Sequence, residues 1–423
     1  MFTQLTGLVL KIDKILLAAA LALSVIIIFY ALIKEARRSQ RRRHLQEIRR
    51  HLQDMTRTGR ADIEETMPVF VDGYSPQEFI DLARDRELEL PQEVDQRIRD
   101  YFASGAKIEQ IESAARKTGN KWRRIEAIIS LGYVNSPGAA EILKRSLYSA
   151  DEDMSYYSLR ALGQIKNNAA ARILLEFLGV HADSGYNIAL TLETFPPEIA
   201  EELFQALESP LQPVRYWALK VIGKFKFQGN NGRVTRIIEL SRDDNADVRA
   251  AACECLGGLD APGIKEALTD RLGDKFWFVR MHAVRALDNV LGPLSLPAVA
   301  KLIKDPSWKV KEGVKNIMVQ NITAALPYIE DNLAHGDEPT CRACADALID
   351  SGYILIILKH LLSGQKGLEE KAAHLLAGLI KCKIYFGLKK AVDNFVPEEQ
   401  TRLLQVITAL DGDTARRIIG EPA

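Results

Sequence analysis

Two pairs of cysteines in this chain have the spacing from which reactive sites are built. Cys341 and Cys344 form a C-x-x-C pair, and Cys253 and Cys255 are separated by one residue. A C-x-x-C redox motif needs a strand-to-helix turn with one thiol at a helix N-terminus, and a structural zinc site needs four ligands. Both pairs fall inside predicted helices, and no second C-x-x-C occurs. We therefore expect core thiols, and the odd total of five cysteines fits no closed disulfide framework.

A phosphate-binding loop is the second chemistry to weigh. Residues 258–265 read GLDAPGIK, but the working motif places lysine directly after the second glycine, followed by Ser or Thr. Here Ile264 stands between Gly263 and Lys265, and no predicted strand precedes the loop. The motifs GxGxxG, HExxH and GxSxG are absent from the sequence. We predict no catalytic, cofactor-binding or metal-binding residues, and expect that the protein is not an enzyme.

The helices that carry these residues repeat along the chain. The segment VRAAACECLG, residues 248–257, has relatives before and after it, separated by steps of 28 to 34 residues. A small or apolar residue recurs at the fifth position, at Ala127, Ser158, Ala189, Ala218, Ala252, Ala283, Val314, Ala345 and Ala373. Small residues there let two helices approach closely. Each unit is predicted to be a helix, a turn rich in Gly, Pro, Asn or Asp, and a second helix.

The pattern V-R-x-x-A-x-x-x-L-G, followed by a turn and a second Leu-rich helix, resembles the HEAT-repeat superfamily. It is most similar to the short bacterial repeats named after phycobilisome lyases, over about residues 119–412. The resemblance implies an all-α fold, an α-solenoid of about nine to ten helix-turn-helix repeats. It also implies a scaffold whose second helices line a concave, partner-facing side. The di-iron branch of such proteins depends on His-Glu dipeptides, which this sequence lacks. A phycobilin-lyase-like activity stays open.

Five basic residues occupy one equivalent position of the repeat: Arg215, Arg249, Arg280, Lys311 and Arg342. Acidic residues stand in the turns before several of them, as Asp243, Asp244 and Asp247 do. We predict a structural ladder between neighbouring repeats, because the planar guanidinium can bond a carboxylate and a backbone carbonyl together. A row of cations that binds an anion is the alternative.

Partner contacts are expected at polar positions of the second helices, where solvated charge is the competing interpretation. The candidates are Arg172, Glu176, Arg233, Arg236, Lys265, Arg271, Lys301 and Lys304. Large aromatic residues of the first helices are expected to pack between repeats instead. These are Trp122, Trp217, Trp277 and Trp308.

The N-terminal region is predicted to anchor the chain in a membrane. Residues 15–33 carry no charge and span roughly 28 Å as a helix, close to the thickness of a bilayer core. A cleaved signal peptide would have a shorter apolar stretch and a small-x-small cleavage site. Basic residues are concentrated on the C-terminal flank, which places the N-terminus outside and the repeats in the cytoplasm. The expected location is the inner (cytoplasmic) membrane, crossed once, and cysteines there stay reduced.

The predicted organisation has five segments. Residues 1–14 are a short extracytoplasmic segment, 15–33 the transmembrane helix, 34–60 a basic juxtamembrane helix, 61–118 a linker with leading helices, and 119–423 the solenoid. The basic helix can lie on anionic lipid headgroups, form a short stalk or act as a solvated spacer. Headgroup contacts are expected from Arg37, Arg38, Arg41, Arg42 and Arg43.

Charge narrows the class of partner. Residues 1–60 carry 12 Lys and Arg against 4 Asp and Glu, a net charge of +8, and the remainder carries 44 against 52, a net charge of −8. Nucleic acid is therefore not expected as a partner. The sequence predicts a membrane-anchored, non-catalytic scaffold or adaptor that binds a membrane or membrane-associated protein and needs no cofactor. An enzyme of envelope polysaccharide synthesis is a natural client. A HEAT-repeat enzyme accessory and a self-assembling structural protein are the alternatives, and the oligomeric state stays open.

Overall fold

The computed structural model describes residues 92–116, 119–225 and 231–419, with isolated positions between 32 and 76. These residues are helical or lie in turns, without a β-strand among them. The predicted all-α fold is confirmed for this part of the chain. The predicted membrane span, except for Leu32, and most of the basic segment lie outside it. The chain divides into two compact units, Met1–Ile173 and Leu174–Ala423.

Unit 1 is built from consecutive helices joined by short turns. Its described helices are α4 (Gln92–Phe102), α5 (Gly105–Arg116), α6 (Lys121–Val134), α7 (Ala139–Leu147) and α8 (Glu152–Ile165), and α9 (Asn168–Val180) crosses the boundary between the units. Helix α6 contacts α4, α5, α7 and α8. Arg99 of α4 donates a 2.8 Å hydrogen bond to the carbonyl of Tyr133, whose hydroxyl donates at 2.7 Å to Asp95. The two leading helices predicted within 61–118 are therefore packed onto the repeats.

Unit 2 continues the alternation of helices and short turns. Its helices are α10 (Gly185–Leu192), α11 (Ala200–Ala206), α12 (Gln212–Ile222), α13 (Asn231–Leu240), α14 (Ala246–Leu256), α15 (Ile264–Arg271), α16 (Trp277–Leu291), α17 (Leu296–Val299), α18 (Trp308–Gln320), α19 (Ile322–His335), α20 (Glu338–Asp350), α21 (Tyr353–Leu361), α22 (Lys366–Lys381), α23 (Tyr385–Val392), α24 (Pro397–Leu410) and α25 (Gly412–Ile419). Short 3-10 helices, η1 (Ala182–Ser184), η2 (Pro197–Ile199), η3 (Gly292–Ser295) and η4 (Ala300–Lys304), flank α10, α11 and α17.

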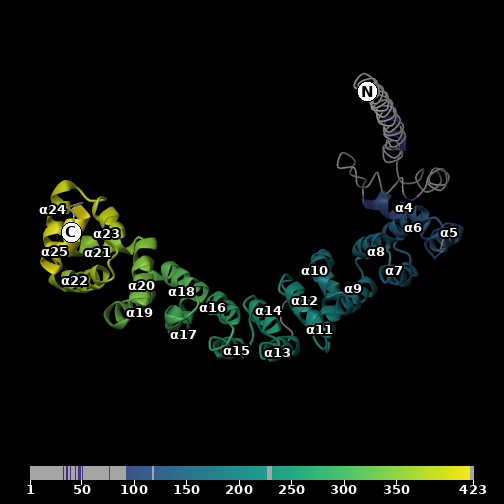
Figure 1. Ribbon diagram of the computed structural model, residues 1–423. Helices are drawn as coiled ribbons and strands as arrows, with labels where there is room; N and C mark the ends of the chain where they lie inside the picture. Colours follow the sequence, from purple (N-terminus) through teal and green to yellow (C-terminus); the bar gives the residue numbers. More distant parts are fainter. Residues whose placement is uncertain are drawn as a thin grey trace, which may run out of the picture. The chain divides into compact units, whose positions relative to one another are not determined.

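The first and second helices of the repeats form two rows in unit 2. In Figure 1, α12, α14, α16, α18 and α20 follow one another in one row, and α11, α13, α15, α17 and α19 follow one another in the other. Each first helix of this series contacts the next, and α11, α13, α15, η4 and α19 each contact the first helix of the following repeat. No repeat therefore completes its own core, and each closes the core of its neighbour.

Side-chain caps fix where several first helices begin. Asn120, Asp151, Asn245 and Asp337 precede α6, α8, α14 and α20, and each accepts hydrogen bonds from backbone amides of the first turn. The cap satisfies donors that have no partner inside the helix. A polar residue in the preceding turn therefore marks the start of these four first helices, whereas α12, α16 and α18 begin without a side-chain cap.

Small residues set how closely the first helices approach. The recurring fifth position is buried at Ala127, Ser158, Ala189, Ala218, Ala252, Ala283, Val314 and Ala345, and half-buried at Ala373. Glycine is required five residues later at two places. A Cβ added to Gly132 would lie 2.7 Å from the Cα of Ala161, and one added to Gly257 would lie 2.9 Å from the Cα of Ala286. The same contact therefore recurs between α6 and α8 and between α14 and α16.

One stretch of the described residues, Trp277–Lys304, is long and apolar enough to cross a membrane by length and composition alone. It consists of α16, η3, α17 and η4, and is broken at Gly292, where φ is +54°. Val279, Leu287 and Val299 are buried against neighbouring helices. A core helix of a folded domain passes the same test, so this stretch gives only weak evidence for a membrane span. It is not the span predicted at residues 15–33.

Candidate interaction surface

The turns between repeats contain a regular network centred on buried arginines. Arg249 of α14 is 6% exposed. Its Nε and Nη2 donate to the two carboxylate oxygens of Asp274 at 2.7 and 3.0 Å. Its Nη1 donates to the carbonyls of Asp243 and Asp244 at 2.9 and 3.1 Å. One guanidinium therefore joins the start of its own helix to the turn of the next repeat.

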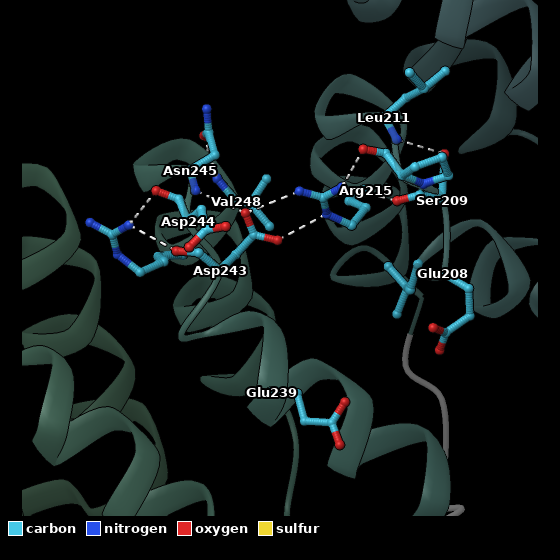
Figure 2. A network of polar contacts seen from close by, with 12 residues as sticks. Glu208, Ser209, Leu211, Arg215, Glu239, Asp243, Asp244, Asn245 and Val248 are labelled. Atoms are coloured by element: carbon cyan, nitrogen blue, oxygen red, sulfur yellow. Dashed lines mark hydrogen bonds and ion pairs between the residues drawn. The ribbon is translucent and has the colours of Figure 1, made fainter.

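The same contacts occur at two further repeats. Arg215 bonds Asp243 at 2.9 and 3.1 Å, and Arg280 bonds Asp305 at 2.6 and 2.8 Å. Each of these arginines also donates to two carbonyls five and six residues earlier in the chain. Figure 2 shows Arg215 between the turn that begins at Ser209 and the carboxylate of Asp243. We call Arg215, Arg249 and Arg280 with their aspartates the arginine ladder.

Electrostatics makes the ladder a structural element. Burial alone would raise the pKa of the Asp274 carboxyl, but hydrogen bonds from Arg249 and from the Phe276 amide outweigh it and hold that pKa below its usual value. The hydrogen bond to Asp305 raises the pKa of Arg280. The N–H groups of each guanidinium donate to a carboxylate and to backbone carbonyls of the chain itself. The geometry favours structural contacts over the alternative of an anion-binding row.

The two other residues predicted for the ladder do not form rungs. Lys311 makes no hydrogen bond or ion pair with a carboxylate within the described residues, and it influences the pKa of Asp337 only through its charge. Lysine lacks the guanidinium fork that spans two acceptors. Arg342 instead bonds Glu338, one turn earlier in its own helix, at 3.3 Å. The following turn, residues 363–367, reads SGQKG and offers no carboxylate.

Three of the predicted partner-binding residues are arginines that lie close to carboxylates of the chain itself. Arg233 bonds Glu201 at 2.6 Å and lies over the ring of Phe204. Arg236 is within 3.0 Å of Glu208 and 2.8 Å of Glu239.

Arg271, the third of them, lies 3.6 Å from Asp274. The other five are exposed. Arg172 and Glu176 lie on α9 and also have contacts within the chain, Lys265 lies on α15, and Lys301 and Lys304 lie on η4. Of the predicted headgroup contacts, Arg43 is described and exposed, and the other four lie outside the described residues.

All five cysteines are buried and free, which excludes disulfides in this structure. Burial raises the pKa of Cys253, Cys255, Cys344 and Cys382 to about 12 in each case. Such thiols stay protonated at neutral pH and are poor nucleophiles. Within the described residues, no group of three or more His, Cys, Asp or Glu side chains is arranged to hold a metal ion.

The tryptophans include exposed side chains that the sequence predicted to be packed between repeats. Trp122 is 63% exposed and Trp308 is 69% exposed, so that prediction is wrong for both. Trp217 does pack between repeats, because a Cβ on Gly185 would collide with its indole ring. Periodicity placed all four residues in or just before first helices, but it does not tell which side of the helix each occupies.

Comparison with known proteins identifies the repeats. The family model of HEAT repeats matches residues 108–193 and 234–318. The match begins at 108, inside the predicted linker region 61–118. No curated protein matches the chain.

Solved structures resemble the chain at low sequence identity. An engineered protein is 17% identical, with 81% of this chain and 96% of that chain covered and a TM-score of 0.31. Kap121p is 16% identical, with 88% of this chain and 47% of that chain covered and a TM-score of 0.42. A designed armadillo repeat protein is 18% identical, with 52% and 98% covered and a TM-score of 0.26. The chain spans about half the length of Kap121p. The HEAT-repeat model therefore matches two stretches of an all-helical array, residues 108–193 and 234–318.

Proposed function

We propose that this protein is a non-catalytic scaffold that binds a protein partner through its repeat array at the cytoplasmic face of a membrane. One observation carries the proposal: the repeats are held together by internal contacts, and charged side chains of the second helices remain exposed to solvent. In the arginine ladder, the buried aspartates of the turns are paired with arginines. Lys265, Lys301 and Lys304, by contrast, remain exposed on the second row of helices. HEAT repeats commonly act as such interaction surfaces.

The membrane part of the proposal rests on the uncharged stretch 15–33 and on its basic C-terminal flank. A single anchor of this kind would cross the inner membrane with its N-terminus outside. Confinement to the membrane raises the effective concentration of the array for a partner in the same membrane. We propose a membrane enzyme as the partner, because a partner in the same membrane is the one whose binding is strengthened by this confinement.

The cysteines support a non-catalytic role. A nucleophilic or redox cysteine is ordinarily accessible and has a lowered pKa, whereas Cys253, Cys255, Cys344 and Cys382 are buried and have a raised one. The ladder arginines, which form the most regular row of charges in the repeats, are likewise engaged in structural contacts. We therefore do not propose them as substrate-binding residues.

Affinity capture tests this function. The full chain, tagged at its C-terminus, is recovered from the membranes of its own cells, beside a variant with Lys301→Glu and Lys304→Glu. The proposal expects one membrane protein in stoichiometric amount with the natural chain, and at least about tenfold less with the variant, because opposed charges at a contact repel.

A matched variant, Lys366→Glu with Lys371→Glu, makes the same charge change on exposed positions of a first helix, α22, and should keep the partner. Equal loss of the partner from both variants would contradict the role of the second helices. Recovery of a second copy of this chain as the stoichiometric partner would favour self-assembly instead.

A further inference from the structure

Aromatic and lysine side chains gather where two neighbouring first helices begin. Phe276 caps the start of α16, and it is 39% exposed. Trp277 and Trp308 are the first residues of α16 and α18, each three residues before the equivalent repeat positions Arg280 and Lys311. Helices α16 and α18 are in contact. We call the residues Lys275, Phe276, Trp277, Trp308 and Lys309 the tryptophan edge.

The lysines of the tryptophan edge make cation–π contacts with its aromatic rings. The ammonium of Lys309 lies 4.4 Å from the centroid of the Trp277 ring, in the preceding repeat, and 5.9 Å from that of Trp308. The ammonium of Lys275 lies 5.0 Å from the centroid of Phe276. Both lysines are exposed. Cation–π contacts of this kind hold the charge beside the ring while leaving it open to solvent.

The two aspartates that precede the edge in the sequence do not neutralise it. Asp274 directly precedes Lys275 and Asp305 lies three residues before Trp308, but both are buried and each accepts hydrogen bonds from a ladder arginine. Within the described residues, neither Lys275 nor Lys309 forms an ion pair. The edge is thus apolar and positively charged together.

The arginine ladder also holds the edge in place. Arg280 donates to the carbonyls of Asp274 and Lys275 at 2.7 and 3.3 Å. The amide of Phe276 donates to Asp274 at 3.0 Å, and the amide of Ser307 donates to Asp305 at 2.8 Å. The backbone that carries the rings is therefore ordered before any contact, which lowers the entropy lost when they bind.

We propose that the tryptophan edge rests on an anionic lipid bilayer. Indole rings favour the zone between headgroups and acyl chains, where the apolar body is buried and the N–H stays solvated. Each lysine near an anionic surface strengthens binding by about fivefold. The cations are lysines, whose compact hydrated charge suits many headgroups, and not the guanidinium forks that select one bidentate partner. The inference rests on the proposed membrane anchoring, which keeps the array within reach of the surface.

Fluorescence quenching tests the contact in the full chain, reconstituted into vesicles with acyl chains brominated to quench nearby indoles. Trp122→Phe with Trp217→Phe leaves only the two tryptophans of the edge, and Trp277→Phe with Trp308→Phe leaves only the other two. In phosphatidylcholine vesicles that contain phosphatidylglycerol, the first variant should be quenched and blue-shifted, at least about twofold more than the second, because only edge indoles enter the interface.

Charge removal provides the control. In the first variant, Lys275→Gln with Lys309→Gln should weaken the edge contact by about thirtyfold and abolish the quenching. Lys389→Gln with Lys390→Gln, exposed lysines of α23, should leave it unchanged.

Flotation with the vesicles separates the two proposals. Vesicle-bound chain with unquenched edge tryptophans would overturn this inference alone, and would leave the edge for a protein contact. Chain that fails to float with phosphatidylcholine vesicles would overturn the anchoring. Chain that floats only with anionic vesicles, with quenched edge tryptophans, would support the edge and refute the anchor.

Discussion

Arg249 can be buried because every branch of its guanidinium has an acceptor. The carboxylate of Asp274 takes two of the hydrogen bonds and two turn carbonyls take the others. A buried charge that loses its partner is costly, because desolvation is no longer offset. The same residue type at the same repeat position, Arg342, is exposed, and among the described residues Glu338 is its sole ion-pair partner.

This difference predicts unequal costs for one substitution. Arg249→Met leaves the buried Asp274 with only the Phe276 amide and the 3.6 Å contact of Arg271, and should lower the local free energy of unfolding by about 3 kcal/mol. Arg342→Met should cost about 0.5 kcal/mol or less, because the contact of an exposed ion pair is screened by solvent. Amide hydrogen exchange in α14 and α16, compared with that in α20, measures both. Equal protection in the two variants would contradict the role assigned to the ladder.

The ladder should also respond to pH. The folded-state pKa of Asp274 is below its ordinary value of 3.8, so the ionised carboxylate stabilises the fold at neutral pH. This contribution is lost as the pH falls below about 4 through the folded-state pKa. Asp274→Asn should therefore be less stable than the natural chain at pH 7, with the difference shrinking toward pH 3. Melting temperatures across this range measure it, and a constant difference down to pH 3 would argue against the assignment.

Part of this residue-level geometry could be predicted from the sequence. The repeat spacing of Arg215, Arg249 and Arg280, with acidic residues in the turns between repeats, predicted Asp–Arg contacts between neighbouring repeats, and the structure contains them. The prediction rested on the turns that precede the arginines, whereas each carboxylate comes from the turn that follows. The absence of a carboxylate from residues 363–367 was also visible in the sequence and accounts for Arg342. The exposure of Trp308 was not predictable, because a period of 31 residues fixes the repeat position and not the packing of the first turn.

At the scale of the helix, the sequence predicted first helices better than second ones. First helices carry the recurring small residue, and α12, α14, α16, α18 and α20 all form as expected. The second helical segment after α16 is instead divided into η3, α17 and η4. Pro293 and Pro297 lie inside this segment, and proline removes a backbone donor and disfavours continuous helix. Apolar periodicity alone does not report such a break.

Close approach of first helices predicts the effect of one methyl group. Gly257→Ala would place a Cβ 2.9 Å from the Cα of Ala286 and should destabilise the α14–α16 contact by about 1–3 kcal/mol. Gly258→Ala is the matched control, because its Cβ meets only the Cys255 carbonyl oxygen at 3.7 Å. Thermal unfolding of the two variants gives the comparison. A Gly257→Ala chain as stable as the Gly258→Ala chain would show that the helices are not in close contact.

In the whole molecule, the repeats provide the surfaces that we propose bind a partner, and residues 15–33 would hold these surfaces at a membrane. HEAT repeats at residues 108–193 and 234–318 leave exposed charge on the second row of helices and an aromatic, basic edge at the starts of two first helices. Confinement to a membrane would strengthen any contact of these surfaces with a partner in that membrane, without a new contact being formed. The anchor should therefore strengthen partner binding by keeping the array at the membrane, and any apolar helix of the same length should serve equally well.

Replacement of the anchor tests this claim most directly. Residues 15–33 are exchanged for an unrelated apolar helix of the same length, or removed, and association with the captured partner is measured on membranes from the same cells. The exchanged anchor should preserve association, whereas removal should lower the apparent affinity by about a hundredfold or more. A chain without residues 15–33 that associates as strongly as the full chain would contradict a role for membrane confinement.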